Sequence, residues 1–377
     1  MHARRLLHLV GTSRVGGTER FLSSLTAGLR QAGWINGIAV LEAPGPLAEA
    51  YARAADEVRH LDVGSRGVVG ALREWRALVR TFAPDIVILY GFRANLLGRV
   101  ASGAVPVVSA LRSVYIDERG TRVARWLDRA TFHRVDACIA NSQEAIRRHL
   151  AAGFPADRFV WIPNGIDVSR FRGVSRERAR ERMHVSRDQR IVLSVANLKP
   201  VKNHGVLLEA SRALHDAGVH HRLWLAGEGP QRGALEERAR ALGILSHVDF
   251  LGAVPDPLDC YACADAFALT SDYEGTPTAL IEAFAAGVPV VATRVGDVPA
   301  MCAGGAGLVV PPRDAAATAR ALEAVLTDAD LAGRLRARGA DAAAHYSTGA
   351  MVSRYARVLE DVAEGRPPSV AVEAVAG

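Results

Sequence analysis

Two glutamates, Glu274 and Glu282, flank the start of a predicted helix in the segment SDYEGTPTALIEAFAAGVPVV. Pro277 suits the first position of a helix, and Thr276 before it can cap the first N–H groups. A glycine after the apolar run is typical of a helix end, so we predict a helix over 277–286. Glu274 then precedes the positive end of the helix dipole, and Glu282 lies roughly 7–8 Å further along the axis.

A helix amino end attracts anions, so a diphosphate bound there would lie between the two carboxylates. Carboxylates accept hydrogen bonds from vicinal hydroxyl groups, which predicts a ligand with hydroxyls on both sides of its diphosphate. A nucleotide sugar, with its ribose, diphosphate and hexose, has this layout. An exposed helix glutamate is the simpler alternative for Glu282, but its apolar neighbours in TALIEAFA leave little solvent face on this helix.

Lysine is rare in this chain, which makes its two lysines informative. Of 46 basic residues, only Lys199 and Lys202 are lysine, and the others are arginine. Arginine and lysine are not interchangeable, so the proximity of the two lysines indicates that a compact ammonium group is needed here. Lys202 lies just before a predicted helix, where it can reach phosphate oxygens. Chance clustering and a solvated surface lysine are the alternatives.

A glycine-rich turn, GTSRVGGTERF, follows the first predicted strand. It nearly matches a phosphate-binding P-loop, but Gly17 stands where that motif needs lysine, and the dinucleotide motif Gly-x-Gly-x-x-Gly is absent. Gly16 and Gly17 open a predicted helix and could bring backbone N–H groups close to a phosphate or a sugar. A plain tight turn explains the two glycines equally well.

These residues need a scaffold, and the chain alternates short apolar runs with helical patterns. Predicted strands lie at 6–10, 37–40, 85–90, 106–111 and 136–141, then at 191–196, 221–227, 248–252, 266–270, 289–293 and 307–311. Predicted helices include 19–31, 94–101 and a closing helix over 351–362. The alternation is typical of βα units with a mostly parallel sheet. We expect two doubly wound α/β domains that meet near 165–185, with ligand-binding turns at the carboxyl ends of their strands.

Length and composition exclude several classes of protein. At 377 residues, 49% of them apolar, the chain is long enough for two cores and too apolar for disorder. No apolar run reaches the length of about 18 residues that a membrane span needs, and the run near the start is too short for a secretory signal. The net charge of +6 suits anionic small molecules or weak attraction to acidic membranes, and no nucleic-acid-binding module is present.

Metal and disulfide chemistry are not expected. The four cysteines, Cys138, Cys260, Cys263 and Cys302, lack the partners of a disulfide framework or a zinc site, so we predict buried free thiols. The one Asp-x-Asp match, at 328–330, falls between two late predicted helices, where a solvated surface is the natural interpretation. We therefore predict no essential divalent metal and no cofactor.

Taken together, these motifs resemble those of the retaining glycosyltransferases of family 4, also called glycosyl transferases group 1, which have the GT-B fold. The resemblance covers nearly the whole chain. Its most specific element is the glutamate pair with the sequence AFAAGVPVVATRVGDVPAM that follows it. GEGP, FLG, PNGID and the glycine-rich turn stand in the usual order of the family.

The resemblance implies two Rossmann-like, doubly wound parallel-sheet domains that face each other across a cleft. An acceptor-side domain would cover 1–170, and the nucleotide-sugar donor domain would cover 171–347. A closing helix over 348–363 would pack back on the first domain, and 364–377 would be a flexible tail.

The family also implies roles for matching residues. Gly16 and Gly17 would face the diphosphate and the reacting sugar, and Lys202 would neutralise the phosphates. Glu282 would hold the ribose hydroxyls, and Glu274 would contact the donor sugar. Backbone groups after Glu274 would bind the phosphate, and those near FLG would contact the base. The remaining nucleotide-binding positions are Asn197, Gly227, Leu251, Gly252, Val254, Gly275, Thr276, Pro277 and Thr278.

Three positions depart from the family pattern. Asn197 stands where arginine is common, which leaves Lys202 as the main phosphate cation of its loop. Tyr90 and Arg112 stand where many members have histidines that orient the acceptor or the sugar. We expect Arg112 to replace that role by binding an anionic or polyhydroxylated acceptor, so the expected catalytic set is Glu274, Lys202 and Arg112.

The function that the resemblance implies is retaining transfer of a hexose from a nucleoside-diphosphate sugar, with a UDP-sugar as the common case. The acceptor would be a hydroxyl group in glycan, glycolipid or natural-product biosynthesis. Front-face attack, in which the leaving phosphate takes the acceptor's proton, would need no enzymic nucleophile. A nucleotide-sugar 2-epimerase of the same fold and a non-catalytic nucleotide-sugar-binding protein are the alternatives.

The arginine-rich segment 112–134 carries Val123, Trp126, Leu127 and Ala130 at helical spacing. It could line the acceptor site or lie against anionic lipid, which would give weak peripheral membrane association. An amphipathic helix packed on its own domain is the simpler interpretation. We expect a cytoplasmic protein, with the inner membrane surface as a second possible location.

Overall fold

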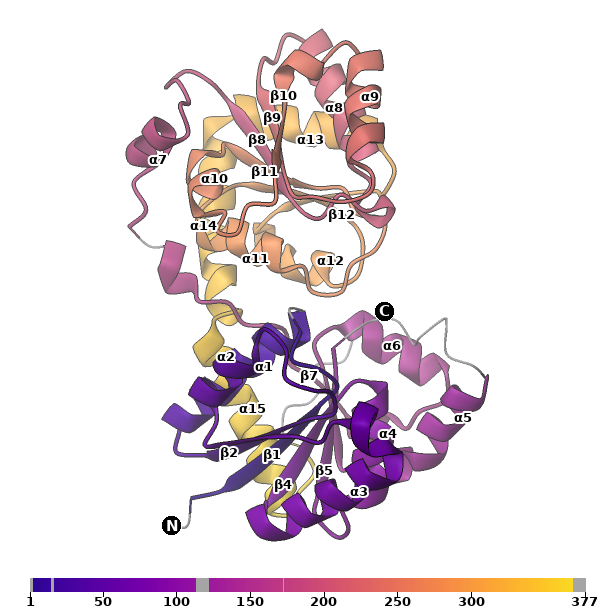
Figure 1. Cartoon of the computed structure of the whole chain (residues 1–377). Coiled ribbons are helices and arrows are strands. Elements are labelled where there is room, and N and C mark those ends of the chain that lie inside the picture. Colours follow the sequence, from indigo (N-terminus) through magenta and orange to yellow (C-terminus); the bar gives the residue numbers. More distant parts are fainter. Residues whose placement is uncertain (1–2, 15–16, 113–121, 172, 369–377) are drawn as a thin grey trace. The chain divides into compact units, whose positions relative to one another are not determined.

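The computed structural model describes residues 3–14, 17–112, 122–171 and 173–368. The chain divides into two compact units (Figure 1). Unit 1 comprises 1–165 together with 348–377, and unit 2 comprises 166–347. The division lies five residues before the boundary of 170 that the sequence suggested. Most of the expected flexible tail, 369–377, lies outside the described residues.

Unit 1 is built on a seven-stranded parallel sheet in the order β3-β2-β1-β4-β5-β6-β7. The strands are β1 Arg5–Val10, β2 Ile35–Val40, β3 Glu57–His60, β4 Ile86–Tyr90, β5 Val107–Leu111, β6 Ala137–Ala140 and β7 Phe159–Trp161. The helices are α1 Gly17–Gln31, α2 Ala48–Ala54, α3 Val63–Phe82, α4 Phe92–Ala101, α5 Arg122–Thr131, α6 Gln143–Ala151 and α15 Thr348–Ala363. The strands expected from apolar runs all form, and the half-buried edge strand β3 was not predicted.

Helices cover both faces of this sheet, which is why its central strands are apolar on both sides. One core joins alternate residues of the strands, such as Leu6 and Val10, to α1, α2 and α15. The other joins the intervening residues, such as Leu7 and Leu9, to α3 and α4. Beyond α4, the core of α6 and the turn after α5 includes Cys138, which pairs in register with Ser109. Thus α3 to α6 form one layer and α1, α2 and α15 form the other.

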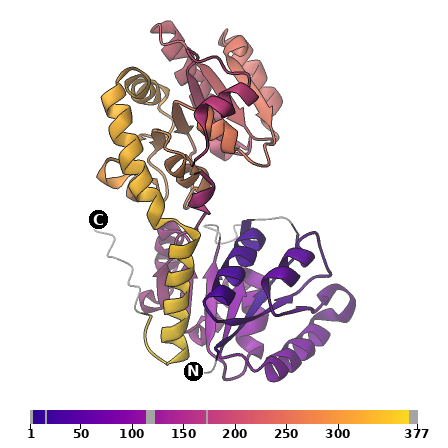
Figure 2. The same cartoon turned by 90° about the vertical axis from the view of Figure 1, so that its left-hand side faces the viewer.

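The last helix of the chain, α15, returns to unit 1 and packs against α1, as the family resemblance implied (Figure 2). The contact is close at Gly28, where a Cβ atom would lie 2.4 Å from Cγ2 of Val352. The rings of Phe21 and Tyr355 meet in the same contact, with centroids 5.7 Å apart. The missing side chain at Gly28 therefore leaves room for the side chain of Val352.

Unit 2 has a six-stranded parallel sheet in the order β10-β9-β8-β11-β12-β13. The strands are β8 Ile191–Val195, β9 Arg222–Ala226, β10 Val248–Gly252, β11 Ala266–Leu269, β12 Val290–Thr293 and β13 Leu308–Val310. The helices are α7 Arg176–Arg182, α8 His204–Asp216, α9 Arg232–Ala241, α10 Leu258–Cys263, α11 Thr278–Ala285, α12 Val298–Met301, α13 Ala315–Thr327 and α14 Ala329–His345. The short 3₁₀ helices of unit 2 are η3 Val168–Phe171, η4 Pro200–Lys202, η5 Leu245–His247 and η6 Ala303–Gly305, and those of unit 1 are η1 Phe132–Arg134 and η2 Ala156–Arg158.

Three smaller expectations can be compared with the structure. All four cysteines are buried free thiols, as predicted. Asp328 of the Asp-x-Asp match caps α14 by accepting a hydrogen bond from the backbone N–H of Leu331 at 2.9 Å, so it has a structural role. Within the described ranges, no helix has the length and apolar character to cross a bilayer.

Candidate functional site

The amino end of α11 has no side-chain cap. The helix begins at Thr278, one residue later than predicted, and Pro277 is its N-cap residue with an extended backbone. The predicted cap, Thr276, is wrong, because its hydroxyl donates instead to Oδ2 of Asp297 at 2.6 Å. No side-chain cap hydrogen bond forms at this helix end within the described residues, which leaves it suited to an anionic ligand.

Glu274 and Lys202 form an ion pair beside this helix end. Lys202 Nζ donates to Oε1 of Glu274 at 2.6 Å, and the hydroxyl of Ser271 donates to the same oxygen at 2.6 Å. Glu274 is only 8% exposed, so the pair lies in a partly desolvated place where charges interact strongly. Ser271 was not predicted, although it directly follows an apolar strand, which is the signal that could have identified it.

Strand order brings these two residues together. Lys202 ends η4 in the loop after β8, and Glu274 lies in the loop after β11, which is the neighbouring strand. The hydroxyl of Thr270 donates to the carbonyl of Lys202 at 3.2 Å. Asp272 accepts from Asn203 at 2.9 Å and from two nitrogens of Arg313 at 3.0 Å, and these contacts lower its pKa. The two loops are thus held against each other.

The loop after β12 supports the glutamate loop from a third side. Gly296 has φ of +54°, and a Cβ atom there would lie 2.2 Å from the carbonyl oxygen of Glu274. The backbone N–H of Asp297 donates to the carbonyl of Gly275 at 3.1 Å. Neither Gly296 nor Asp297 was assigned a role from sequence, although both belong to the VGDVPAM part of the quoted motif.

Glu282 lies about one turn into α11 and has a separate partner. The hydroxyl of Tyr261, from α10, donates to Oε2 of Glu282 at 2.8 Å and lies 3.1 Å from the carbonyl oxygen of Ala279. Burial raises the pKa of Glu282, and the Tyr261 hydroxyl and the Arg170 guanidinium partly offset this effect. Tyr261 is fully buried and was not singled out from the sequence.

The remaining predicted donor residues lie in the loops after β8, β9 and β10. Asn197 is exposed, and a Cβ atom at Gly227 would lie 1.9 Å from the carbonyl oxygen of Ala196, so this glycine permits a close approach of two loops. Gly227 also bridges Gly252, which has φ of +74°. Leu251 and Val254 are half-buried and pack against the core of unit 2.

The predicted residues of unit 1 are described in part. Gly17 is the first residue of α1, and Gly16 lies outside the described residues. Arg112 directly follows β5, and its guanidinium carbon lies 3.4 Å from the centroid of the Phe21 ring. Burial lowers the pKa of Arg112, whereas the nearby hydroxyls of Tyr355 and Tyr90 favour its charged form.

The donor-side residues therefore gather into two groups in unit 2. The pair of Lys202 and Glu274 lies with the amino end of α11, and Glu282 lies further along that helix with Tyr261. The first group can hold an anion, and the second offers a carboxylate oxygen to hydroxyl groups. In the part of the chain that the structure describes, no three histidine, cysteine or acidic side chains gather as a metal site.

Comparisons with known proteins show which family of proteins this chain resembles. Residues 15–170 match the family model described as Glycosyltransferase Family 4, and residues 175–342 match Glycosyl transferases group 1. The D-inositol 3-phosphate glycosyltransferase of Nocardia farcinica is 36% identical over 221 residues, which cover 56% of this chain and 48% of that protein. The chain thus spans about half the length of this curated relative.

Two further proteins cover more of the chain. The lipopolysaccharide core biosynthesis glycosyltransferase LpsE of Rhizobium meliloti is 28% identical over 286 residues, 75% of this chain and 77% of that protein. The crystal structure of Anabaena Alr3699/HepE in complex with UDP superposes with a TM-score of 0.84 over 95% of this chain and all of that chain, at 20% identity. At that identity the likeness concerns the fold.

Proposed function

Because the chain belongs to the glycosyltransferases of family 4 (group 1), we propose that it transfers a hexose from a nucleoside-diphosphate sugar to a hydroxyl acceptor with retention of configuration. The observation that carries the proposal is the uncapped amino end of α11 beside the ion pair of Lys202 and Glu274. Products would belong to glycan, glycolipid or natural-product biosynthesis.

The diphosphate would bind the first N–H groups of α11, between Gly275 and Thr278. Lys202 would donate to its oxygens, and since Lys202 now pairs with Glu274, an arriving diphosphate would share the ammonium group with that carboxylate. Glu274 would then accept hydrogen bonds from hydroxyls of the hexose. These groups would stabilise the negative charge that develops on the leaving diphosphate.

The nucleoside would extend toward Glu282. With Oε2 held by Tyr261, the other carboxylate oxygen is available to the vicinal hydroxyls of ribose. Backbone groups at Leu251, Gly252 and Val254 would contact the base. We expect the base to be uridine, because HepE, a protein of the same fold, was crystallised with UDP.

In the transfer step, the bond between the anomeric carbon and the phosphate oxygen breaks. The acceptor oxygen forms its bond on the same face of the sugar, and its proton passes to the leaving phosphate oxygen. The side chains of this chain would position and stabilise these groups, so no covalent intermediate is required. We propose that the step needs no divalent metal, which activity in excess EDTA would test.

The alternatives can be separated by particular residues. A 2-epimerase would need acidic residues and a histidine placed for elimination. His8 of unit 1 does not suit that role, because it is fully buried between Tyr90 and Asn36 and burial lowers its pKa to about 4. A non-catalytic binding protein would be expected to lack Lys202 or one of the two glutamates, and all three are present.

A thermal-shift screen with UDP, GDP, ADP and their hexose conjugates tests the proposal, because a ligand that binds the folded state raises the unfolding midpoint. Glu282→Ala and Lys202→Ala should each reduce the shift and abolish transfer while the circular dichroism spectrum stays unchanged. Normal turnover by both variants would show that the site assignment is wrong.

We also propose that unit 1 attaches weakly to anionic membrane surfaces through the layer of α3 to α6. These four helices carry eleven arginines and three acidic residues, a net charge of +8, whereas α1, α2 and α15 carry five basic and four acidic residues, a net charge of +1. Val123 and Trp126 on α5 are 62% and 67% exposed. Exposed apolar groups on a basic face suit anionic lipid. Equal co-sedimentation of the protein with anionic and zwitterionic vesicles would contradict this attachment.

A further inference from the structure

Arg112 is a half-buried cation that has no carboxylate partner among the described residues. Its Nε and Nη1 atoms are buried and make no hydrogen bond, and no ion pair of Arg112 occurs among the described residues. The Phe21 ring under the guanidinium gives a favourable cation–π contact but no hydrogen bond. A buried charge is costly unless it is paired and hydrogen-bonded, so this arrangement is incomplete.

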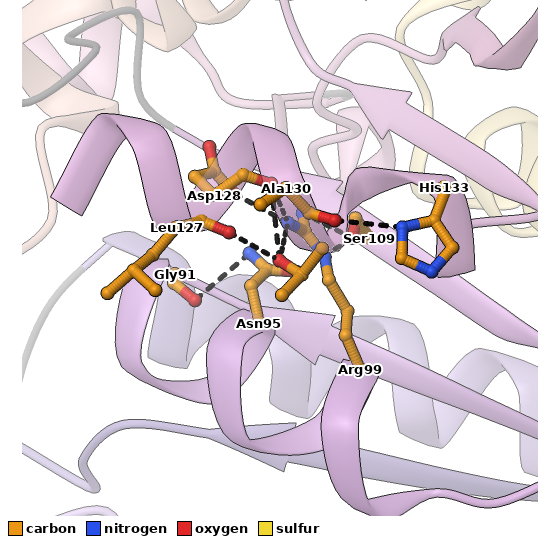
Figure 3. A network of polar contacts seen from close by, with 9 residues as sticks. Gly91, Asn95, Arg99, Ser109, Leu127, Asp128, Ala130 and His133 are labelled. Carbon is orange, nitrogen blue, oxygen red and sulfur yellow. Dashed lines mark hydrogen bonds and ion pairs between the residues drawn. The ribbon is translucent and has the colours of Figure 1, made fainter. Parts of the chain in front are cut away.

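A fully buried arginine of unit 1, Arg99, shows how a carboxylate can pair with such a guanidinium, although its own Nε is also buried without a hydrogen bond (Figure 3). Nη1 of Arg99 donates to Oδ1 of Asp128 at 2.5 Å and to Thr131 at 3.3 Å, and its Nη2 donates to Ser109 at 3.1 Å. That guanidinium ties α4 to α5 and to the sheet. Among the described residues, Arg99 thus has a carboxylate partner and Arg112 does not.

A second unpaired group lies next to Arg112. The hydroxyl of Tyr355 on α15 is buried and has no hydrogen-bond partner. It lies close enough to Arg112 to affect the pKa of both groups, although the geometry of a hydrogen bond is not met. A guanidinium and a phenol hydroxyl from different elements thus lie close together, and neither the hydroxyl nor the two buried guanidinium nitrogens make a hydrogen bond within the described part of the chain.

The position of Arg112 and Tyr355 in the fold indicates from which side a group that accepts their hydrogen bonds would approach. Arg112 follows β5, and its neighbour Tyr90 ends β4, which is the adjacent strand. Phe21 lies near the start of α1, the helix after β1. Ligands of open parallel sheets bind at this carboxyl edge.

We infer that Arg112 and Tyr355 form an anion-binding site in unit 1 that takes a phosphate or carboxylate group of the acceptor. The planar fork of an arginine matches two oxygens of such a group. That the anion belongs to the acceptor rests on the proposed glycosyl transfer, whereas anion binding by Arg112 does not. A purely structural brace between α1 and α15, held by the stack on Phe21, is the alternative.

The two roles predict opposite effects on stability. Arg112→Met keeps the length of the side chain and removes the unpaired charge, so without anions this variant should unfold a few degrees higher than the wild type. If Arg112 were a brace, the same variant should unfold at a lower temperature. Arg73→Met, on the exposed surface of α3, is the control with an equal change of net charge.

Anion binding is measured by thermal shift at pH 7 and constant ionic strength, with chloride as the reference and inorganic phosphate and acetate as probes. The Lys202→Ala background removes the main phosphate cation of unit 2. In the Lys202→Ala protein, phosphate or acetate should still raise the unfolding midpoint. Adding Arg73→Met should leave this rise in place, and adding Arg112→Met should remove it. Arg112→Lys, which keeps the charge without the fork, should retain only part of the shift. The probe that gives the larger shift identifies the class of anion.

Two results would overturn the inference. One is the absence of any shift with phosphate or acetate in the Lys202→Ala protein. The other is an equal shift in the Arg112→Met and Arg73→Met variants. A failure of the donor-site proposal is distinguishable, because it would appear as unchanged binding of nucleoside diphosphates in Lys202→Ala and Glu282→Ala, whatever Arg112 does.

Discussion

The hydrogen bond between Tyr261 and Glu282 offers the sharpest test of the donor site. Tyr261→Phe removes one hydroxyl and keeps the buried ring, so the core of unit 2 should be preserved. A hydrogen bond to a charged group contributes about 1.5–3 kcal/mol, and this part of the stabilisation of ionised Glu282 would be lost. Since the lost hydrogen bond favours the ionised carboxylate, the pKa of Glu282 should rise further in the variant.

This change gives a pH-dependent loss of nucleotide affinity. Burial already raises the pKa of Glu282 above its usual value, and only the ionised carboxylate can accept hydrogen bonds from both ribose hydroxyls. The acid limb of nucleotide affinity should therefore move to higher pH in Tyr261→Phe. Well above the shifted pKa, the affinity should return toward that of the wild type.

Isothermal titration with UDP between pH 5.5 and 8.5 measures this shift. Glu282→Gln is the matched control, because its affinity should be weak and nearly independent of pH over the acid limb. The folded state with a raised carboxyl pKa binds the proton more tightly than the unfolded chain, so the stability contribution of Glu282 should improve as the pH falls through its folded pKa. Identical pH profiles for the wild type and Tyr261→Phe would refute the reasoning.

Three further changes test other parts of the structure. Lys202→Ala should weaken nucleoside-diphosphate binding at least about tenfold, since a charge-assisted hydrogen bond is lost; an unchanged dissociation constant would contradict this. Gly296→Ala should destabilise unit 2 and lower transfer, because its methyl group would collide with the Glu274 carbonyl; urea denaturation and activity would show it. Gly28→Ala should cost about 1–3 kcal/mol of unfolding free energy by overpacking against Val352, and the double variant with Val352→Ala should recover most of that loss.

Much of the architecture could be predicted because its signals are local. Apolar runs such as 86–90 and 191–195 lie in strands buried on both faces, and such strands are continuously apolar in the sequence. The edge strand β3 was missed because Glu57–His60 is half-buried and polar, which resembles a loop. The helix after Glu274 was predicted to within a residue at each end, but the role of Thr276 was wrong because its partner comes from the loop after β12.

By itself, the sequence determined the alternation of strands and helices, the position of two glutamates around a helix start, and the presence of a lysine in an arginine-rich chain. Only the tertiary structure decided which of these groups meet. Lys202 reaches Glu274 because β8 and β11 are neighbours, and Tyr261 reaches Glu282 because its hydroxyl, from α10, meets α11. Arg112 has no carboxylate partner among the residues that the structure describes. The physical reason is that periodicity and capping depend on residues a few positions apart, whereas pairing between side chains depends on strand order and packing across the whole unit.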